Sequence, residues 1–192
     1  MTAPEPETIT SDDFAPLKKS YALISQTVPD TQIISGEQMP AIPRKLLDHT
    51  RDMTSTLHHF SAEPITLRAM QFRRKGNLYI RQVILLTEKS KRPIEFGAIQ
   101  IHLNQFSKQA LEEILHGTMP LGAIIELHGI KHQSKPKNLF CVHSDKVINH
   151  ALDIKGTEKL YGRCNTLSDN KGNTLAEVVE ILPPEETLTS WK

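Results

Sequence analysis

Arg81 is the residue whose position most clearly suggests chemistry. It interrupts the strand-like run 78–86, in which Tyr79, Val83 and Leu85 are apolar and share its face. A cation that faces a core needs an anion, and the planar guanidinium matches a carboxylate in two parallel hydrogen bonds. We therefore expect either an acidic side chain or a bound carboxylate opposite Arg81.

The last apolar segment, 174–182, adds two acids, Glu177 and Glu180. They project to opposite faces of a strand, each among apolar neighbours, so periodicity does not choose between them. A carboxyl group in apolar surroundings binds protons more tightly, which suits a general acid or a partner for a ligand hydroxyl. The structural alternatives are a buried salt bridge between Arg81 and Glu180, or two exposed side chains at sheet edges.

A third candidate is Pro120-Leu121-Gly122, a tight connection that could offer backbone N–H groups to an anion. The alternative is a simple turn, because proline and glycine occur in most loops.

Other candidates are weaker. His128 and His132 are four residues apart but flank Gly129 without helical periodicity, which argues against zinc. Cys141 and His143 would share a strand face, whereas a catalytic Cys–His pair is normally assembled from distant segments. We expect no metal and no cofactor, since a phosphate loop and a dinucleotide fingerprint are also missing.

Composition narrows the class of protein. The 192 residues are 38% hydrophobic and 23% charged with a net charge of +1, which fits one domain and gives no electrostatic case for nucleic acid or membrane surfaces. The basic run 73–75 is most simply a solvated hairpin end. The chain has two cysteines and shows no signal peptide. It also has no apolar stretch near the roughly twenty residues that cross a bilayer, and these features together predict a cytoplasmic protein.

The periodicity changes along the chain. We expect a flexible N-terminal arm over 1–37 with a short helix near Tyr21, and then a helix over 45–57 with a break near Asp52. A hairpin should follow, formed by strands over 65–72 and 78–86, and then a third strand over 94–103. A helix over 106–115 should end at Gly117, and strands over 160–167 and 174–182 should form a second hairpin. Segment 123–142 stays unassigned. The order predicts an α+β domain with a mostly antiparallel sheet.

Five short segments, taken in order, resemble the chorismate pyruvate-lyase (4-hydroxybenzoate synthase) family, in its divergent members outside the ubiquinone pathway. They lie at 52–54, 79–86, 120–122, 160–163 and 180–183. The resemblance covers about residues 40–184. It implies a chorismate lyase-like domain over 38–184, with about six antiparallel strands, flanking helices and an enclosed cavity, followed by a C-terminal tail over 185–192.

The resemblance also implies an activity and roles for residues. Family enzymes eliminate pyruvate from chorismate to give 4-hydroxybenzoate, without metal or organic cofactor. By motif, Arg81 would grip the ring carboxylate, helped by backbone N–H groups at Met53 and at Leu121-Gly122. Glu180 would face the ring hydroxyl, either as acid or base or in a positioning role, and this resolves the tie between the two acids of the last strand.

One departure affects the expected ligand. Members of the ubiquinone pathway carry an arginine after the glycine of the third strand, whereas Ala98 follows Gly97 here. The change removes a cation that could meet the second carboxylate of chorismate. Arg163 or Lys131 could substitute, or the ligand differs.

Two alternatives share the expected fold. UTRA-like effector-binding domains of bacterial regulators resemble it and only sense small molecules, here a small carboxylate. They usually carry an N-terminal helix-turn-helix domain, for which residues 1–37 are too short and too proline-rich, and this favours the lyase. The third class is a structural or partner-binding protein with a degenerate pocket. The sequence predicts neither the oligomeric state nor the pathway that the product feeds.

Overall fold

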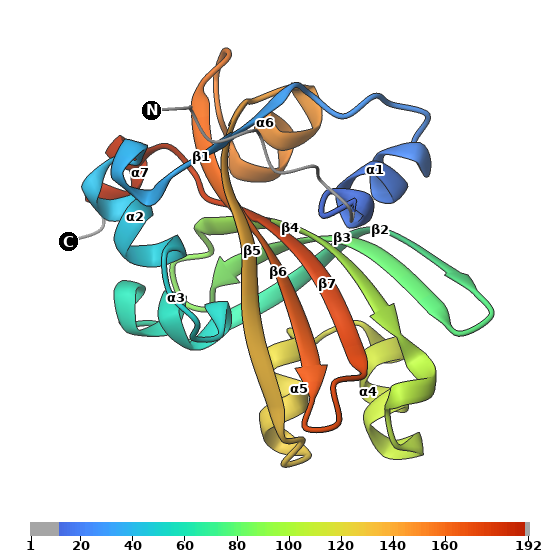
Figure 1. The fold of residues 1–192 in the computed structure, drawn as a ribbon. Helices are drawn as coiled ribbons and strands as arrows, with labels where there is room; N and C mark the ends of the chain where they lie inside the picture. Colours follow the sequence, from blue (N-terminus) through green and yellow to red (C-terminus); the bar gives the residue numbers. More distant parts are fainter. Residues whose placement is uncertain (1–11, 191–192) are drawn as a thin grey trace, which may run out of the picture.

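The computed structural model describes residues 12–190, and within them one antiparallel sheet organises the chain (Figure 1). Its strand order is β1-β5-β6-β7-β4-β3-β2. The strands are β1 Thr31–Ile34, β2 Ile65–Lys75, β3 Leu78–Thr87, β4 Pro93–His102, β5 His132–His143, β6 Lys159–Asp169 and β7 Thr174–Ile181. The expected α+β class with a mostly antiparallel sheet is confirmed.

Helices cover both faces of this sheet. On one face lie α1 Ala15–Ala22 and α6 Lys146–Leu152, and on the other lie α2 Ala41–Leu47, α3 Met53–Ser61, α4 Lys108–His116 and α5 Leu121–Leu127. The short α7 Glu185–Thr189 packs against α2. Single 3-10 turns at Gly36–Gln38 and Leu103–Gln105 complete the connections.

The two expected hairpins pair as β2–β3 and β6–β7. Gly76 and Gly172 occupy their turns with φ of 58° and 84°, a backbone region that glycine enters without steric cost. Ser107 caps the start of α4 and Gly117 ends it at φ 75°, as the sequence predicts. The expected break near Asp52 is also present, because that residue caps the start of α3 after α2 has ended.

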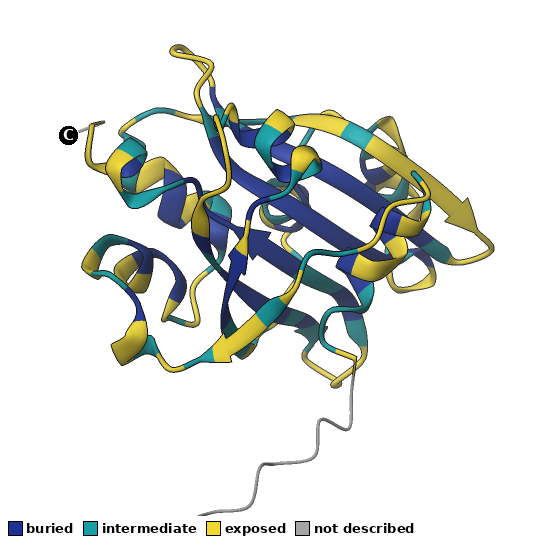
Figure 2. Ribbon diagram, turned by 90° about the horizontal axis from the view of Figure 1, so that it is seen from above, coloured by how far each residue is buried: buried dark blue, intermediate teal, exposed yellow. Residues whose placement is uncertain are grey.

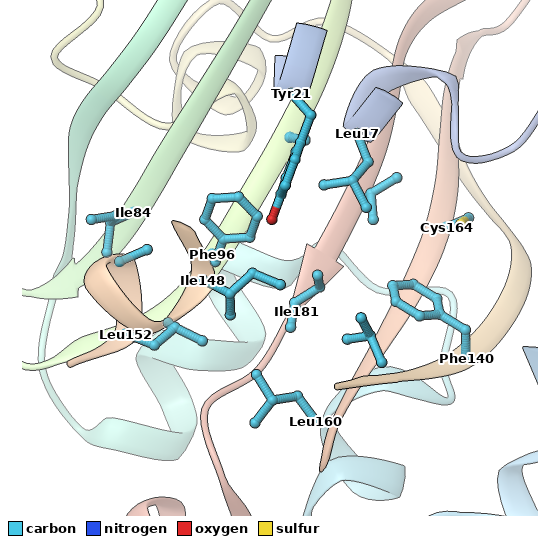
Figure 3. Close-up of a cluster of buried hydrophobic side chains, with 14 residues drawn as sticks. Leu17, Tyr21, Ile84, Phe96, Phe140, Ile148, Leu152, Leu160, Cys164 and Ile181 are labelled. Carbon is cyan, nitrogen blue, oxygen red and sulfur yellow. The ribbon is translucent and has the colours of Figure 1, made fainter. Parts of the chain in front are cut away.

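Alternation along the strands gives the sheet two apolar faces of different character. The face under α1 and α6 is closed by a continuous cluster that includes Tyr21, Phe96 and Phe140 (Figure 3). The opposite face carries two separate clusters, one under α4 and α5 and one under α2 and α3. The space between those two clusters is where a cavity forms.

Burial follows this layering (Figure 2). The central strands β3, β4 and β7 are buried along most of their length, whereas the far end of the edge strand β2 is exposed. Residues 73–75 lie on that exposed end, as expected for a solvated hairpin.

The structure differs from the sequence expectation in two places. The expected flexible arm extends over residues 1–37, and its first eleven residues lie outside those described. From Asp12 onward it is not loose, because α1 buries Leu17 and Tyr21 completely and β1 pairs with β5. The unassigned segment 123–142 contains most of α5 and of β5. Domain boundaries at 38 and 184 stay predictions.

None of the helices between residues 12 and 190 is both long and apolar enough to cross a bilayer. Over the same residues, no group of three or more His, Cys, Asp or Glu side chains is arranged to hold a metal ion.

The packing around Gly162, on β6 beneath the cavity, leaves no room for a side chain. A Cβ atom there would lie 2.5 Å from the Glu180 carbonyl oxygen and would overlap the Phe140 ring. We expect Gly162→Ala to lower the free energy of unfolding by about 3 kcal/mol in urea denaturation, since backbone cannot yield as a flexible side chain can.

Gly172→Ala in the β6–β7 turn is the matched control. That position has open space around it but a positive φ, so the cost should stay near 1 kcal/mol. Equal losses in the two variants would mean that Gly162 is not confined as described.

Candidate ligand-binding site

A cavity opens on the sheet face that α2, α3, α4 and α5 cover. Its empty volume is about 580 Å³, which includes space that is open to solvent. Most of its wall is apolar, from Leu67, Val83, Leu85, Ile99, Leu121, Leu167 and Val178. Polar side chains enter from β3, β4, β6 and β7 and from the start of α3.

Arg81 lies in this wall and is 1% exposed. Its Nη2 donates to the Met119 carbonyl oxygen at 3.4 Å, while Nε and Nη1 are buried and have no hydrogen-bond partner among the described residues. Among residues 12–190 no acidic side chain forms an ion pair with it. Burial lowers the pKa of Arg81 to about 10, so the guanidinium remains charged near neutral pH. The structural alternative, a salt bridge between Arg81 and Glu180, is not formed, because Glu180 pairs with Arg163.

Two helices begin beside this guanidinium. Asp52 caps α3 by accepting a hydrogen bond from the Ser55 N–H at 2.8 Å, and α5 starts directly after the Pro120 that follows Met119. Gly122 lets the two helix starts approach, because a Cβ atom there would lie 3.3 Å from Thr54 Oγ1. The first N–H groups of a helix have no acceptor within the helix. Arg81 therefore makes one end of the cavity attractive to an anion, although the Asp52 carboxylate lines the same end and lies 3.5 Å from the Cβ position of Gly122.

Glu180 lines the cavity and is 5% exposed, but its charge is already paired. Arg163, opposite it on β6, donates from Nε to Glu180 Oε2. The same guanidinium donates from Nη1 to the His49 carbonyl oxygen at 2.9 Å and from Nη2 to the Arg51 carbonyl oxygen at 3.2 Å. Arg163 thus ties the α2–α3 loop to the sheet and neutralises Glu180.

Glu95 is a polar lining residue that the sequence interpretation missed. It is 3% exposed, and its Oε2 is buried with no hydrogen-bond partner in the part of the chain that the structure describes. Its Oε1 lies 3.3 Å from the point where a side chain on Gly97 would begin, so the carboxyl group lies over that glycine. Burial raises the pKa of Glu95 well above its ordinary value, and the charge of Glu180 raises it further, while Arg163 opposes the shift.

The other sequence candidates fall into two groups. Met53, Leu121 and Gly122 line the cavity, as does Glu180, whereas Glu177 lies on the opposite sheet face and accepts from His102 Nε2 and Gln100 Nε2. Lys131 and Arg163, the two cations that could have met a second carboxylate, are not in the cavity wall. Of the described residues that form this wall, Arg81 alone is positively charged.

The two weaker candidate pairs, His128 with His132 and Cys141 with His143, do not form a metal site or a catalytic pair. His128 and His132 lie at the end of α5 and the start of β5, outside any metal-binding group among the described residues. Cys141 is buried and its thiol donates to Gln32 Oε1 at 3.8 Å, while His143 on the same strand is exposed.

Comparison with known proteins identifies the fold. No family model matches the sequence, and no curated protein is similar to it. Among solved structures, PhnF from Mycobacterium smegmatis matches with a TM-score of 0.56 at 9% identity, over 71% of this chain and 65% of PhnF. The shared property is the fold. The chain thus spans less than two thirds of that PhnF structure.

Two further structures support the same fold. The effector domain of PhnF from Mycobacterium smegmatis matches with a TM-score of 0.53 at 9% identity, over 70% of this chain and 89% of the domain. The ligand-binding domain of a protein described as a GntR-family transcriptional regulator from Bordetella bronchiseptica matches with a TM-score of 0.50 at 14% identity, over 63% and 85%. The expectation of a chorismate lyase-like fold is confirmed.

The expected enzymatic activity is wrong. Of the three structures named above, one is described as an effector domain and one as the ligand-binding domain of a transcriptional regulator, and none is described as a lyase. The cavity agrees with this correction, because chorismate carries two carboxylates and the wall holds one cation. A second carboxylate would lie near Glu95 and Glu180 instead of near a positive charge.

The two buried arginines should respond to substitution in opposite ways. Arg163→Met removes one partner of a buried ion pair and should cost about 4 kcal/mol of unfolding free energy. Arg81→Met removes a buried charge that has no partner, so stability should stay constant or rise by about 1 kcal/mol. Urea denaturation of both variants measures the contrast, and equal losses would mean that Arg81 is structural.

Glu95 should make stability depend on pH. A carboxyl group whose pKa is raised by folding stabilises the protein fully below its unfolded value of 4.5, and this contribution is lost as pH rises through the folded value. Glu95→Gln should therefore be more stable than wild type at pH 8, with a difference that narrows toward pH 5. Parallel pH profiles of the unfolding free energy would contradict this assignment.

Proposed function

We propose that the domain binds a small carboxylic acid without transforming it, in the manner of an effector-sensing domain. The observation that carries the proposal is the buried Arg81 guanidinium, which lines a cavity and has two nitrogens without partners. An uncompensated buried cation is costly unless a ligand supplies the anion. A carboxylate is the anion that fits two free N–H donors on a planar group.

The surroundings of Arg81 support a carboxylate in two ways. Helix starts at Met53 and Leu121 border the same space, and their N–H groups favour negative charge. Apolar side chains form most of the remaining wall and suit a ligand with a compact hydrocarbon or aromatic body.

The charges in the cavity favour binding over elimination chemistry. Glu180, which would act as acid or base in a lyase, is held in an ion pair with Arg163. Two structures with this fold are described as an effector domain and as the ligand-binding domain of a transcriptional regulator, and this supports sensing as the proposed role. A small-molecule partner and a cytoplasmic location belong to the same proposal.

Titration calorimetry with benzoate and 4-hydroxybenzoate tests the proposal. Wild-type protein should bind at least one of them, and Arg81→Met should weaken that binding by about 30-fold or more, since a hydrogen bond to a charged group contributes roughly 2 kcal/mol. The acid should be recovered unchanged after incubation.

Arg73→Met is the matched control, because Arg73 is an exposed arginine of the same hairpin. It should leave the affinity unaltered. If small carboxylates of several sizes fail to bind wild-type protein, or bind it and Arg81→Met equally, the proposed function is wrong.

A further inference from the structure

Glu95 places a second polar group at the far end of the cavity from Arg81. In the β3–β4 register Arg81 pairs with Ile99, and Glu95 lies four residues farther along β4, on the same face. The Glu95 carboxyl group folds back over Gly97, two residues from Ile99, so roughly 7 Å of strand separates it from the level of Arg81. A ligand that reaches both must have a polar group at each end.

The charges around Glu95 determine whether its carboxyl group is ionised or neutral when a ligand binds. It shares its end of the cavity with Glu180, opposite Gly97 on the neighbouring strand, and Arg163 is the cation paired there. One guanidinium compensates one carboxylate, so a second ionised carboxyl group would be buried without a counterion. The neutral acid can instead donate one hydrogen bond and accept others.

The Glu95 carboxyl group also has no competing partner. Oε2 is buried and makes no hydrogen bond with the described residues, and Gly97 leaves room above the sheet for the carboxyl group to face the cavity. A buried polar atom without a partner is uncommon in folded proteins, and in the wall of a cavity it suggests a missing ligand atom.

Resting on the proposed function, we infer that Glu95 recognises the ligand end remote from the carboxylate, so that the ligand is a monocarboxylic acid with an uncharged hydroxyl or carbonyl group at its other end. A methyl group at that end would leave the acid without a partner. A second carboxylate would add a negative charge that no remaining cation compensates. Glu95 is therefore a specificity-determining residue, and the site should reject dicarboxylates.

Matched sets of ligands test this inference by calorimetry. Each set has one carboxylate and differs at the remote end, as in 4-hydroxybenzoate, 4-methylbenzoate and terephthalate, with straight-chain acids of different lengths treated in the same way. In wild-type protein the hydroxyl member should bind about tenfold or more tightly than the methyl and dicarboxylate members, because a buried donor without a partner is penalised.

Two variants of Glu95 separate recognition from folding. Glu95→Leu should abolish the preference for the hydroxyl over the methyl member, whereas Glu95→Gln, which keeps a neutral donor of similar size, should retain it. Glu177→Leu removes an acid from the other sheet face and should leave the ranking unchanged. Circular dichroism spectra of the three variants, compared with that of wild-type protein, serve as the check on folding.

The results distinguish the inference from the function on which it rests. Binding that depends on Arg81 but ignores the remote group, or that favours the dicarboxylate, would overturn the role of Glu95 and leave carboxylate binding intact. A ranking that survives Glu95→Leu would overturn it too. Failure of every monocarboxylate to bind would instead overturn the proposed function.

Discussion

The ion pair between Arg163 and Glu180 determines how charge is distributed over the rest of the site. It joins two adjacent strands, and the same guanidinium binds carbonyl oxygens of the loop between α2 and α3. One interaction therefore ties the α2–α3 loop to the sheet and compensates the charge of Glu180. Since Glu180 is paired with Arg163, the proposed ligand would supply the anion for the second buried arginine, Arg81.

This arrangement of charges suits the cavity to a ligand with one negative charge and not to a dianion. The end of the cavity at Arg81 contains one guanidinium, two helix starts and the capping carboxylate of Asp52, whereas the other end contains two carboxyl groups and one cation. The field along the cavity has a direction, and a ligand with one negative end can align with it. In a fold that recurs with under 15% identity, the function must be inferred from such a site and not from the architecture.

Local patterns predicted those features that depend on neighbours in the sequence. Period-two alternation placed Arg81 on a core-facing side, and turn glycines and caps located both hairpins and α4. The same alternation places Glu95 on the face of Gly97 and Ile99 and could have identified it as a core-facing acid. The short apolar run at 123–127 was ambiguous, because strand and helix patterns coincide over so few residues. The pairing of Arg163 with Glu180 and with loop carbonyls arises from strand register and a distant loop, which local periodicity does not encode.

The Arg81 guanidinium, which forms no ion pair with the described residues, also has a consequence in the cell. A domain with a buried, uncompensated charge gives up stability whenever its site is vacant and regains it when an anion arrives. Proteases act on the unfolded fraction, so the vacant form should be degraded faster than the occupied form. The steady-state abundance of this protein would then follow the supply of its ligand.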